Sequence, residues 1–491
     1  MKKECKDNFR RDNKAIALLA GCILFSIAVV LGFLIARGGA TSLGLVILIF
    51  LALVFTAIVF RRGIEKTKSY ILLPIIITIP FPILLRFRGS DAMTVTTVLI
   101  YSLFAVMAFD YLINKERPSL EPKFSFILPA LIVFGMTISF VCNLNFLGQS
   151  LRYYVANMSG ILLYFIVIFS LKKRSDLVLV IKIIVFLIMI QAAIAFSQLK
   201  FPEVYKYLQI FGTRDYSPQL ELVGGIRRVK GTVRDFELLA EWFLIGSILS
   251  IGLIYELRKK FYIIPLFCCL GGIVFTNTRS DLFLFILGLG AVFFLLNLFK
   301  KDYRGTLPKI ILGLILFGAI FSVFFDHQIA NFFARFQKYF GSSNLLSSEA
   351  INRQPIWEMA LKVYFKNPTI FGAGLYRVNS LYPWASSFHS LYLTLLYKFG
   401  VFGFIIHVLF WWGILQLSWR SLMAKKKPES WYILFFLFIA FILLLIDQMK
   451  VEYLRHQHTI QFAWLIYALL VAQFRQVRGS DENSVVSLTS V

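Results

Sequence analysis

The sequence predicts an all-α membrane protein, a polytopic bundle of about fourteen transmembrane helices with twelve as the alternative. Hydrophobic residues make up 58% of the 491 residues and charged residues only 16%, well below the roughly 25% that is usual in soluble domains. Segments without Asp, Glu, Lys or Arg also recur along the whole chain. A soluble fold is therefore excluded.

The charge-free segments mark the predicted spans in order. They are 15–36, 41–60, 69–85, 92–109, 124–151, 153–171, 183–199, 242–255, 261–278, 282–299, 310–325, 399–419, 431–446 and 459–474. The shorter ones need flanking residues such as Lys182 and Glu241 to complete the roughly 20 residues that cross a bilayer. Segment 124–151 is long enough to contain a break. The first segment exceeds the apolar region of a signal peptide, so we expect a retained anchor.

Basic residues in alternate connections predict the orientation. Arg61, Lys172 and Lys425 belong to basic clusters that the positive-inside rule places in the cytoplasm, together with both termini. The predicted divisions are a basic tail 1–14, helices 15–199, an outer basic loop 200–235, helices 236–325, a large outer loop 326–390 with the catalytic elements, helices 391–474 and a polar tail 475–491.

The outer connections also carry an excess of basic residues. Loop 200–235 holds seven basic residues against four acidic ones. Guanidinium groups bind phosphate bidentately, so we expect an anionic ligand at Arg86, Arg88, Arg234, Arg279 and Arg353. The alternative is that each arginine contacts lipid headgroups or a local acid, as Arg279 could with Asp281 and Arg353 with Glu349. Nucleic acid is not expected, because these loops lie between membrane spans.

The segment from Arg353 to Gly403 resembles the O-antigen ligase and Wzy-type polysaccharide polymerase superfamily. Its ligases carry His followed by Asn, Ser or Gln, then nine residues, Gly, two residues, and Gly, Thr or Tyr. His389, Ser390, Gly400 and Gly403 match this pattern. Segments 231–240 and 367–374 and the turn at Arg279 are similar as well. Trp357 stands where many ligases have Leu, and fourteen spans exceed the twelve usual for ligases; both departures count against a ligase rather than against a polymerase.

The resemblance implies a membrane-embedded glycosyltransferase of the GT-C-like type, with a large outer loop before the His-bearing helix. The donor would be a glycan on undecaprenyl diphosphate, and the acceptor a hydroxyl of a glycan, lipid or protein. The resemblance implies no metal and no cofactor. The reaction would belong to O-antigen, capsule or exopolysaccharide biosynthesis at the periplasmic side of a bacterial inner membrane. Alternatives are an O-antigen ligase or protein O-oligosaccharyltransferase in place of a polymerase, and a secondary transporter of an anionic solute.

His389 is the expected catalytic residue among the five histidines. Nearby guanidinium groups disfavour the imidazolium, so a neutral imidazole should be ready to accept the proton of the acceptor hydroxyl. Asp447 lies at the outer end of a predicted span. It would either orient His389 or form an ion pair with Lys450. The other four histidines are expected to be structural.

Overall fold

The protein consists of helices joined by loops over the residues that its computed structural model describes. These are residues 72–81, 94–114, 122–143, 146–201, 228–233, 235–299, 350–375, 387–424 and 430–488. The helices are α4 (Val95–Asn114), α5 (Phe124–Cys142), α6 (Leu147–Ser170), α7 (Arg174–Lys200), α9 (Phe236–Leu257), η2 (Lys260–Tyr262), α10 (Ile263–Thr276), α11 (Arg279–Phe299), α14 (Ala350–Lys366), α16 (Leu391–Met423), α17 (Trp431–Asp447), η4 (Tyr453–Arg455) and α18 (Gln457–Leu488). The predicted all-α class is confirmed.

Six of these helices are long and apolar enough to cross a membrane, namely α5, α6, α7, α9, α11 and α16. Shorter apolar helices occur at Val95–Ala108, Lys260–Thr276 and Trp431–Asp447. Segment 124–151 does contain a break, because α5 ends at Cys142 and α6 begins at Leu147. The predicted spans 15–36, 41–60 and 310–325 lie outside the described residues.

Several helices extend past the charge-free segments. Arg152 lies inside α6 and is exposed, and Lys182 lies inside α7 and is half-buried. Long basic side chains can keep their stems on apolar surface and their charges in water, so a charged residue near a membrane boundary does not end a helix. The charge-free segments predicted these two helices, but they underestimated the lengths of α6 and α7.

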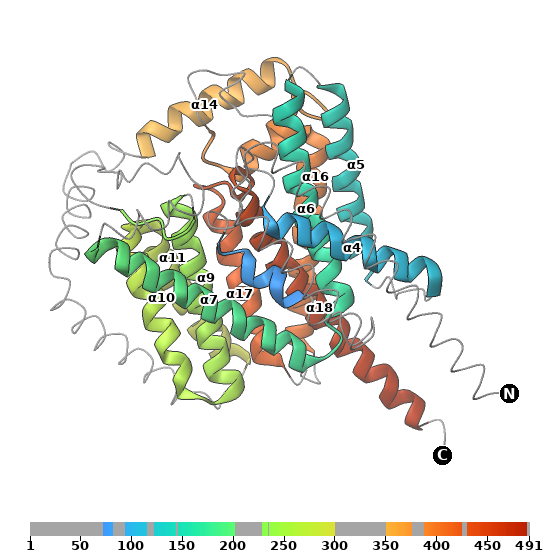
Figure 1. Ribbon diagram of the computed structural model, residues 1–491, viewed down its shortest axis with the longest axis vertical. Coiled ribbons are helices and arrows are strands. Elements are labelled where there is room, and N and C mark those ends of the chain that lie inside the picture. The colour runs from blue at the N-terminus through green and yellow to red at the C-terminus, as the bar shows by residue number, and fades with distance from the viewer. Residues whose placement is uncertain are drawn as a thin grey trace, which may run out of the picture.

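Helix α18 occupies the middle of the bundle. It packs on α6, α16, α17 and α7, and Figure 1 shows α17 and α18 between the group α7, α9, α10 and α11 and the group α5, α6 and α16. Phe462, Leu465 and Tyr467 are almost fully buried, as expected of a helix surrounded by protein. Its polar residues are accommodated because they have partners, such as Gln461, which donates to Ser159 at 3.0 Å.

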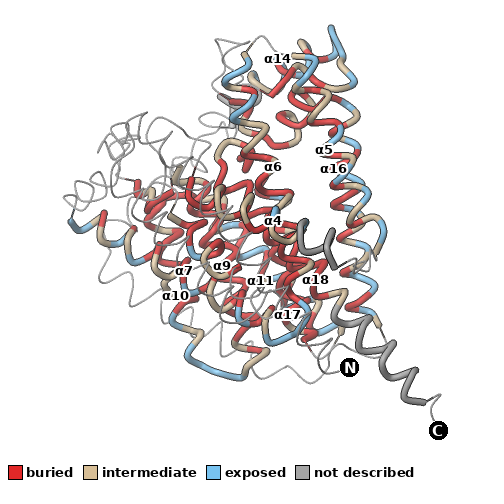
Figure 2. The backbone as a smooth tube through the Cα atoms, turned by 45° about the vertical axis from the view of Figure 1, so that its right-hand side comes forward, coloured by how far each residue is buried: buried red, intermediate tan, exposed pale blue. Residues whose placement is uncertain are grey.

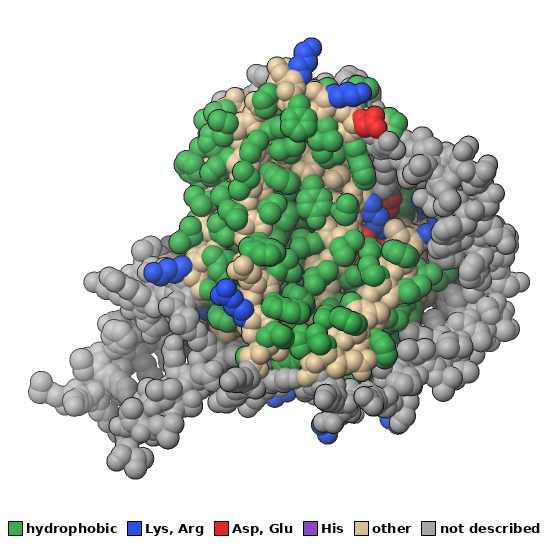
Figure 3. Space-filling view, turned by 180° about the vertical axis from the view of Figure 1, so that it is seen from behind, with side chains coloured by type: hydrophobic (Ala, Val, Ile, Leu, Met, Phe, Trp, Pro, Cys, Tyr) green, Lys and Arg blue, Asp and Glu red, His purple; other side chains and the backbone are tan. Residues whose placement is uncertain are grey.

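The outside of the bundle is apolar, as a surface facing lipid requires. Buried residues follow the inner faces of the helices in Figure 2. Large hydrophobic side chains point outward from several helices, among them Phe134, Phe186, Phe294 and Trp412. The face in Figure 3 is mostly covered by hydrophobic side chains. Together with the span-long helices, this surface supports a membrane bundle.

Helix α14 lies across one end of the bundle, while the last turns of α18 reach the opposite end (Figure 1). Two hydrogen bonds connect α14 to α16 and to the segment before it. The Trp357 indole N–H donates to the carbonyl of Phe388 at 2.8 Å, and the Tyr397 hydroxyl donates to the carbonyl of Ala360 at 2.7 Å. The first contact holds α14 against Phe388, next to His389, and the second holds it against α16.

Helix α16 is broken at Gly400, where φ is 70° and ψ is −171°. The segment 369–373 crosses it there, so the amides of Val401 and Phe402 donate to the carbonyls of Thr369 and Ile370 at 3.3 and 3.1 Å. A Cβ on Gly400 would lie 2.2 Å from the Ile370 oxygen. This φ/ψ region is essentially restricted to glycine. The first glycine of the His motif is therefore needed for a close backbone crossing below His389.

Candidate active site

His389 lies in the short segment 387–390 that leads into α16, and it has a positive φ of 49°. A left-handed backbone is uncommon outside glycine, although histidine and asparagine adopt it more readily than most residues. The flanking residues are fixed: Phe388 accepts the Trp357 hydrogen bond, and the Leu391 amide donates to the carbonyl of Gln448 at 2.9 Å. These anchors hold His389 in place despite its backbone strain.

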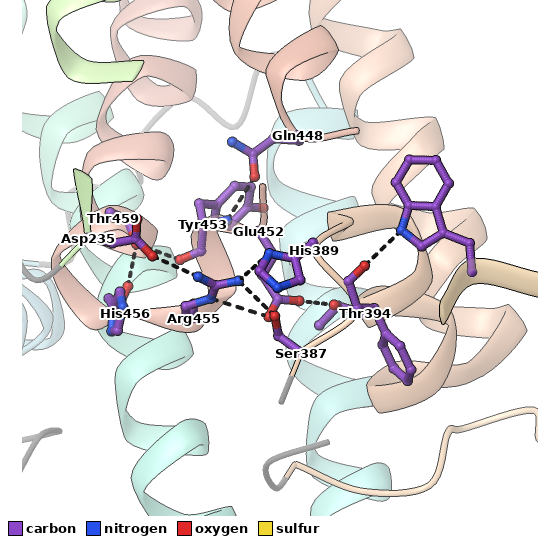
Figure 4. A network of polar contacts seen from close by, with 12 residues as sticks. Asp235, Ser387, His389, Thr394, Gln448, Glu452, Tyr453, Arg455, His456 and Thr459 are labelled. Carbon is purple, nitrogen blue, oxygen red and sulfur yellow. Dashed lines mark hydrogen bonds and ion pairs between the residues drawn. The ribbon is translucent and has the colours of Figure 1, made fainter. Parts of the chain in front are cut away.

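Arg455 contacts the imidazole directly. One terminal guanidinium nitrogen, NH2, lies 3.0 Å from His389 Nδ1 and 2.7 Å from Ser387 Oγ, and the other, NH1, lies 2.7 Å from Asp235 Oδ2. In Figure 4 the guanidinium sits between Asp235 on one side and His389 and Ser387 on the other. Three segments far apart in the chain therefore meet at one cation.

The charge of Arg455 is stabilised by its surroundings. Burial on its own lowers the pKa of the guanidinium, but the Asp235 and Glu452 carboxylates raise it, and the net direction is upward. Glu452 lies 3.7 Å from Arg455 Nε and also accepts a hydrogen bond from Thr394 of α16. Arg455 is thus a permanent cation and a hydrogen-bond donor only.

Asp235 has two roles at the start of α9. As the N-cap residue it accepts the Glu237 amide at 2.9 Å through Oδ1, which satisfies one of the unpaired donors at the helix start. Its other oxygen, Oδ2, binds Arg455. Nearby, the Arg228 guanidinium stacks 4.3 Å from the centre of the Phe236 ring. A second arginine therefore lies close to the same helix end.

A separate polar group surrounds Lys450, just after α17. Its ammonium lies 2.6 Å from Asp281 and 2.8 Å from Asp447, and both carboxylates are fully buried. Burial on its own lowers the pKa of Lys450, but these two carboxylates raise it above its ordinary value. The structure thus brings Asp447 to Lys450, which was one of its two expected roles. It is Arg455 that contacts the imidazole of His389.

Only two of the five predicted phosphate-binding arginines, Arg279 and Arg353, lie within the described residues. Arg279 is the first residue of α11 and half-buried, two positions before the Asp281 that binds Lys450. Arg353 lies in the first turns of α14, where only the backbone is described. Arg86, Arg88 and Arg234 lie outside the described residues, although Asp235 follows Arg234 directly. The structure thus brings the helix that begins at Arg279 to the loop between α17 and α18.

The described residues contain no group of three or more His, Cys, Asp or Glu side chains suited to hold a metal ion. The charges that gather around His389 are those of Arg455, Asp235 and Glu452. A guanidinium presented from a partly buried position offers strong hydrogen bonds to an anionic oxygen. The adjacent imidazole has one ring nitrogen, Nδ1, within 3.0 Å of that guanidinium.

Arg455 and Asp235 were not among the site residues predicted from the sequence. A signal was present, because Lys450, Glu452 and Arg455 interrupt two strongly apolar segments. Ionisable residues at such a position indicate function. Asp235 could have been identified as an N-cap, but its distance of 220 positions from Arg455 gave no sign that they form a pair.

Comparison with known protein families supports the resemblance noted in the sequence. Residues 264–408 match the family model described as O-antigen ligase. The matched region contains α10, α11, α14, His389 and the Gly400 crossing, while Asp235 and Arg455 lie on either side of it. No curated protein matches the chain. The match therefore supports a relationship to the O-antigen ligase superfamily for residues 264–408, the region that contains His389.

Proposed function

We propose that this protein is a membrane glycosyltransferase that moves a glycan from undecaprenyl diphosphate to an acceptor hydroxyl. The O-antigen ligase domain supports an O-antigen ligase or polymerase role in surface polysaccharide biosynthesis. The observation that carries the finer proposal is the contact of 3.0 Å between His389 Nδ1 and Arg455 NH2, with Asp235 bound to the same guanidinium. It joins a candidate proton acceptor to a partly buried cation.

The reaction requires a proton acceptor and a cation close to each other. The acceptor oxygen forms a bond to the anomeric carbon of the glycan, and the bond from that carbon to the diphosphate oxygen breaks with its electron pair left on the diphosphate. The proton of the acceptor hydroxyl passes to His389 as general base. The charge that develops on the leaving diphosphate is stabilised by guanidinium groups, for which Arg279, Arg353, Arg234, Arg86 and Arg88 are the proposed donors beside Arg455.

The proposed side of the membrane is the periplasmic one. α14 and the last turns of α18 lie at opposite ends of the bundle (Figure 1). With a cytoplasmic C-terminus, α14 and the adjacent segment before α16 would lie outside. Lipid-linked glycans and their acceptors would then meet His389 at the outer interface of the bacterial inner membrane. In this proposal the arginines supply the cations, and no metal is needed.

Reconstitution would test the proposed function. The purified protein in proteoliposomes would receive an undecaprenyl-diphosphate-linked oligosaccharide and one of three acceptors: a second lipid-linked oligosaccharide, lipid A core, or a peptide with serine and threonine. Extension of the first acceptor would identify a polymerase, and the others a ligase or a protein glycosyltransferase. Absence of transfer to all three acceptors by well-folded protein would refute the proposal.

A matched pair of variants would link the activity to the site. His389→Asn should lose transfer. Arg174→Lys should retain it, because Arg174 begins α7 and binds Glu256 near the last turn of α9, whereas Asp235 lies at the first turn. Equal activity of the two variants would show that transfer does not depend on His389.

A further inference from the structure

We infer that Arg455 masks the general base in the resting protein and is drawn from His389 to the diphosphate when the donor binds. This inference rests on the proposed function and adds an order of events to it. It follows from the hydrogen bonds of one guanidinium, whose terminal nitrogens have acceptors of different charge.

The first step concerns the proton of the imidazole. Arginine can only donate hydrogen bonds, so at 3.0 Å from Arg455 NH2 the His389 Nδ1 atom must be the acceptor. An imidazolium would instead place two donors and two positive charges against each other. His389 is thus neutral in this arrangement, with its proton on Nε2 and the lone pair of Nδ1 occupied. In that state neither ring nitrogen can accept a proton.

The second step concerns the nitrogen that is able to move. NH1 is bound to the carboxylate of Asp235 at 2.7 Å, a charged pair that fixes one side of the guanidinium. NH2 is held by the neutral acceptors Ser387 Oγ and His389 Nδ1. Ser387 and His389 offer this cation only neutral acceptors, whereas a phosphate oxygen adds charge–charge attraction and can bind a guanidinium bidentately. A diphosphate close to NH2 therefore competes well for it, while Asp235 keeps the side chain in place.

The third step is the consequence for the reaction. Once NH2 turns to the diphosphate, the Nδ1 lone pair is exposed and can accept the proton of the acceptor hydroxyl as the glycosidic bond forms. The products are then an imidazolium with both nitrogens protonated and an anionic diphosphate already bound to Arg455. The base becomes available only with a donor in place. Arg455 is a positioning residue in the resting state and a diphosphate ligand afterwards.

Nitrogen NMR of ¹⁵N-histidine-labelled protein in nanodiscs tests the masking directly. The signals of His389 are assigned by their loss in His389→Asn, which leaves the other four histidines labelled. Without lipid, Nδ1 should appear unprotonated and Nε2 protonated. Undecaprenyl diphosphate should then shift the Nδ1 signal, whereas undecaprenol, which lacks the phosphates, should leave it unchanged.

The outcomes are distinct for the inference and for the function on which it rests. A protonated Nδ1 in the lipid-free protein overturns the inference. An Nδ1 signal that undecaprenyl diphosphate leaves unchanged also overturns it, whether or not binding of the lipid is detected. Failure of transfer in the reconstituted assay overturns the function, whatever the spectrum shows. Arg455→Lys should reduce kcat about 10- to 100-fold, by analogy with the hydrogen-bonded partners that orient metal-binding histidines, and should abolish the lipid-induced shift. Retention of that shift in Arg455→Lys would also contradict the inference, and Arg174→Lys is the matched control.

Discussion

Replacement of His389 by asparagine isolates the chemistry of the imidazole from the strain of its backbone. His389 has a φ of 49°, a conformation that asparagine adopts readily but that costs most other residues about 1–2 kcal/mol. His389→Asn should therefore keep the segment 387–390 in place. His389→Ala removes the same ring and adds the backbone cost, so the difference between the variants measures strain.

The expected magnitudes separate activity from stability. A general base contributes about 10²- to 10⁴-fold to the rate, which corresponds to about 2.7–5.4 kcal/mol in the activation barrier. Loss of the hydrogen bond from the charged Arg455 costs about 1.5–3 kcal/mol of unfolding free energy. The lower end is expected, because Asp235 and Ser387 remain bound to the guanidinium. His389→Asn should thus remain folded and be almost inactive.

The assay is turnover per folded molecule in proteoliposomes, with thermal unfolding followed on the same preparation. His407→Gln serves as the control, because His407 is buried in α16 with Nδ1 2.7 Å from the Gly403 carbonyl oxygen. It should lose about 1–3 kcal/mol of stability and keep its turnover. Near-normal turnover of His389→Asn would show that the residue only orients its neighbours, and the assignment of the base would be wrong.

Four further predictions follow from the described contacts and from the sequence. Gly400→Ala should lower the free energy of unfolding by at least about 1–3 kcal/mol from backbone strain, visible as a lower Tm; an unchanged Tm would contradict the close crossing. Lys450→Met should cost about 3–5 kcal/mol, because it leaves two buried carboxylates without their cation, and denaturant unfolding would measure the loss. Alanine at Arg279 or Arg353 should weaken transfer with the protein still inserted, and lysine should rescue only partly because it lacks the bidentate fork; full activity of both lysine variants would exclude phosphate recognition there. A cysteine at Ser343, which lies outside the described residues, should react with an impermeant maleimide from the periplasmic side, and labelling only from the cytoplasm would reverse the topology.

Apolar length predicted the helices well, because a membrane requires every backbone group to be paired within a helix. α17 spans Trp431–Asp447, almost as its charge-free segment predicts. The helix ends were harder to predict, since α6 and α7 begin before the charge-free segments and include Arg152 and Lys182. α18 shows a second limit of apolar patterns, because a helix that is surrounded by protein can contain polar side chains such as Gln461.

The sequence indicated only those residues of the candidate site that belong to one continuous motif. His389 and Gly400 belong to a single motif, and the structure gives both a positive φ. The pairing of Arg455 with Asp235 joins η4 to the start of α9. It depends on how those elements pack, which no local pattern encodes. Local patterns therefore pointed to His389 and missed the cation beside it.

The polar residues of the candidate site lie where helices begin or are interrupted. His389 precedes α16, Asp235 caps α9, and Arg455 lies in η4 between α17 and α18. Irregular backbone in a membrane protein is tolerated where it is buried in protein or lines a polar cavity, and such places are also where charged side chains can find partners. Low local polarity strengthens each contact and makes an unpaired charge costly. A guanidinium shared between a carboxylate and an imidazole is consequently stable without a ligand, and an anionic ligand can still displace the neutral partner.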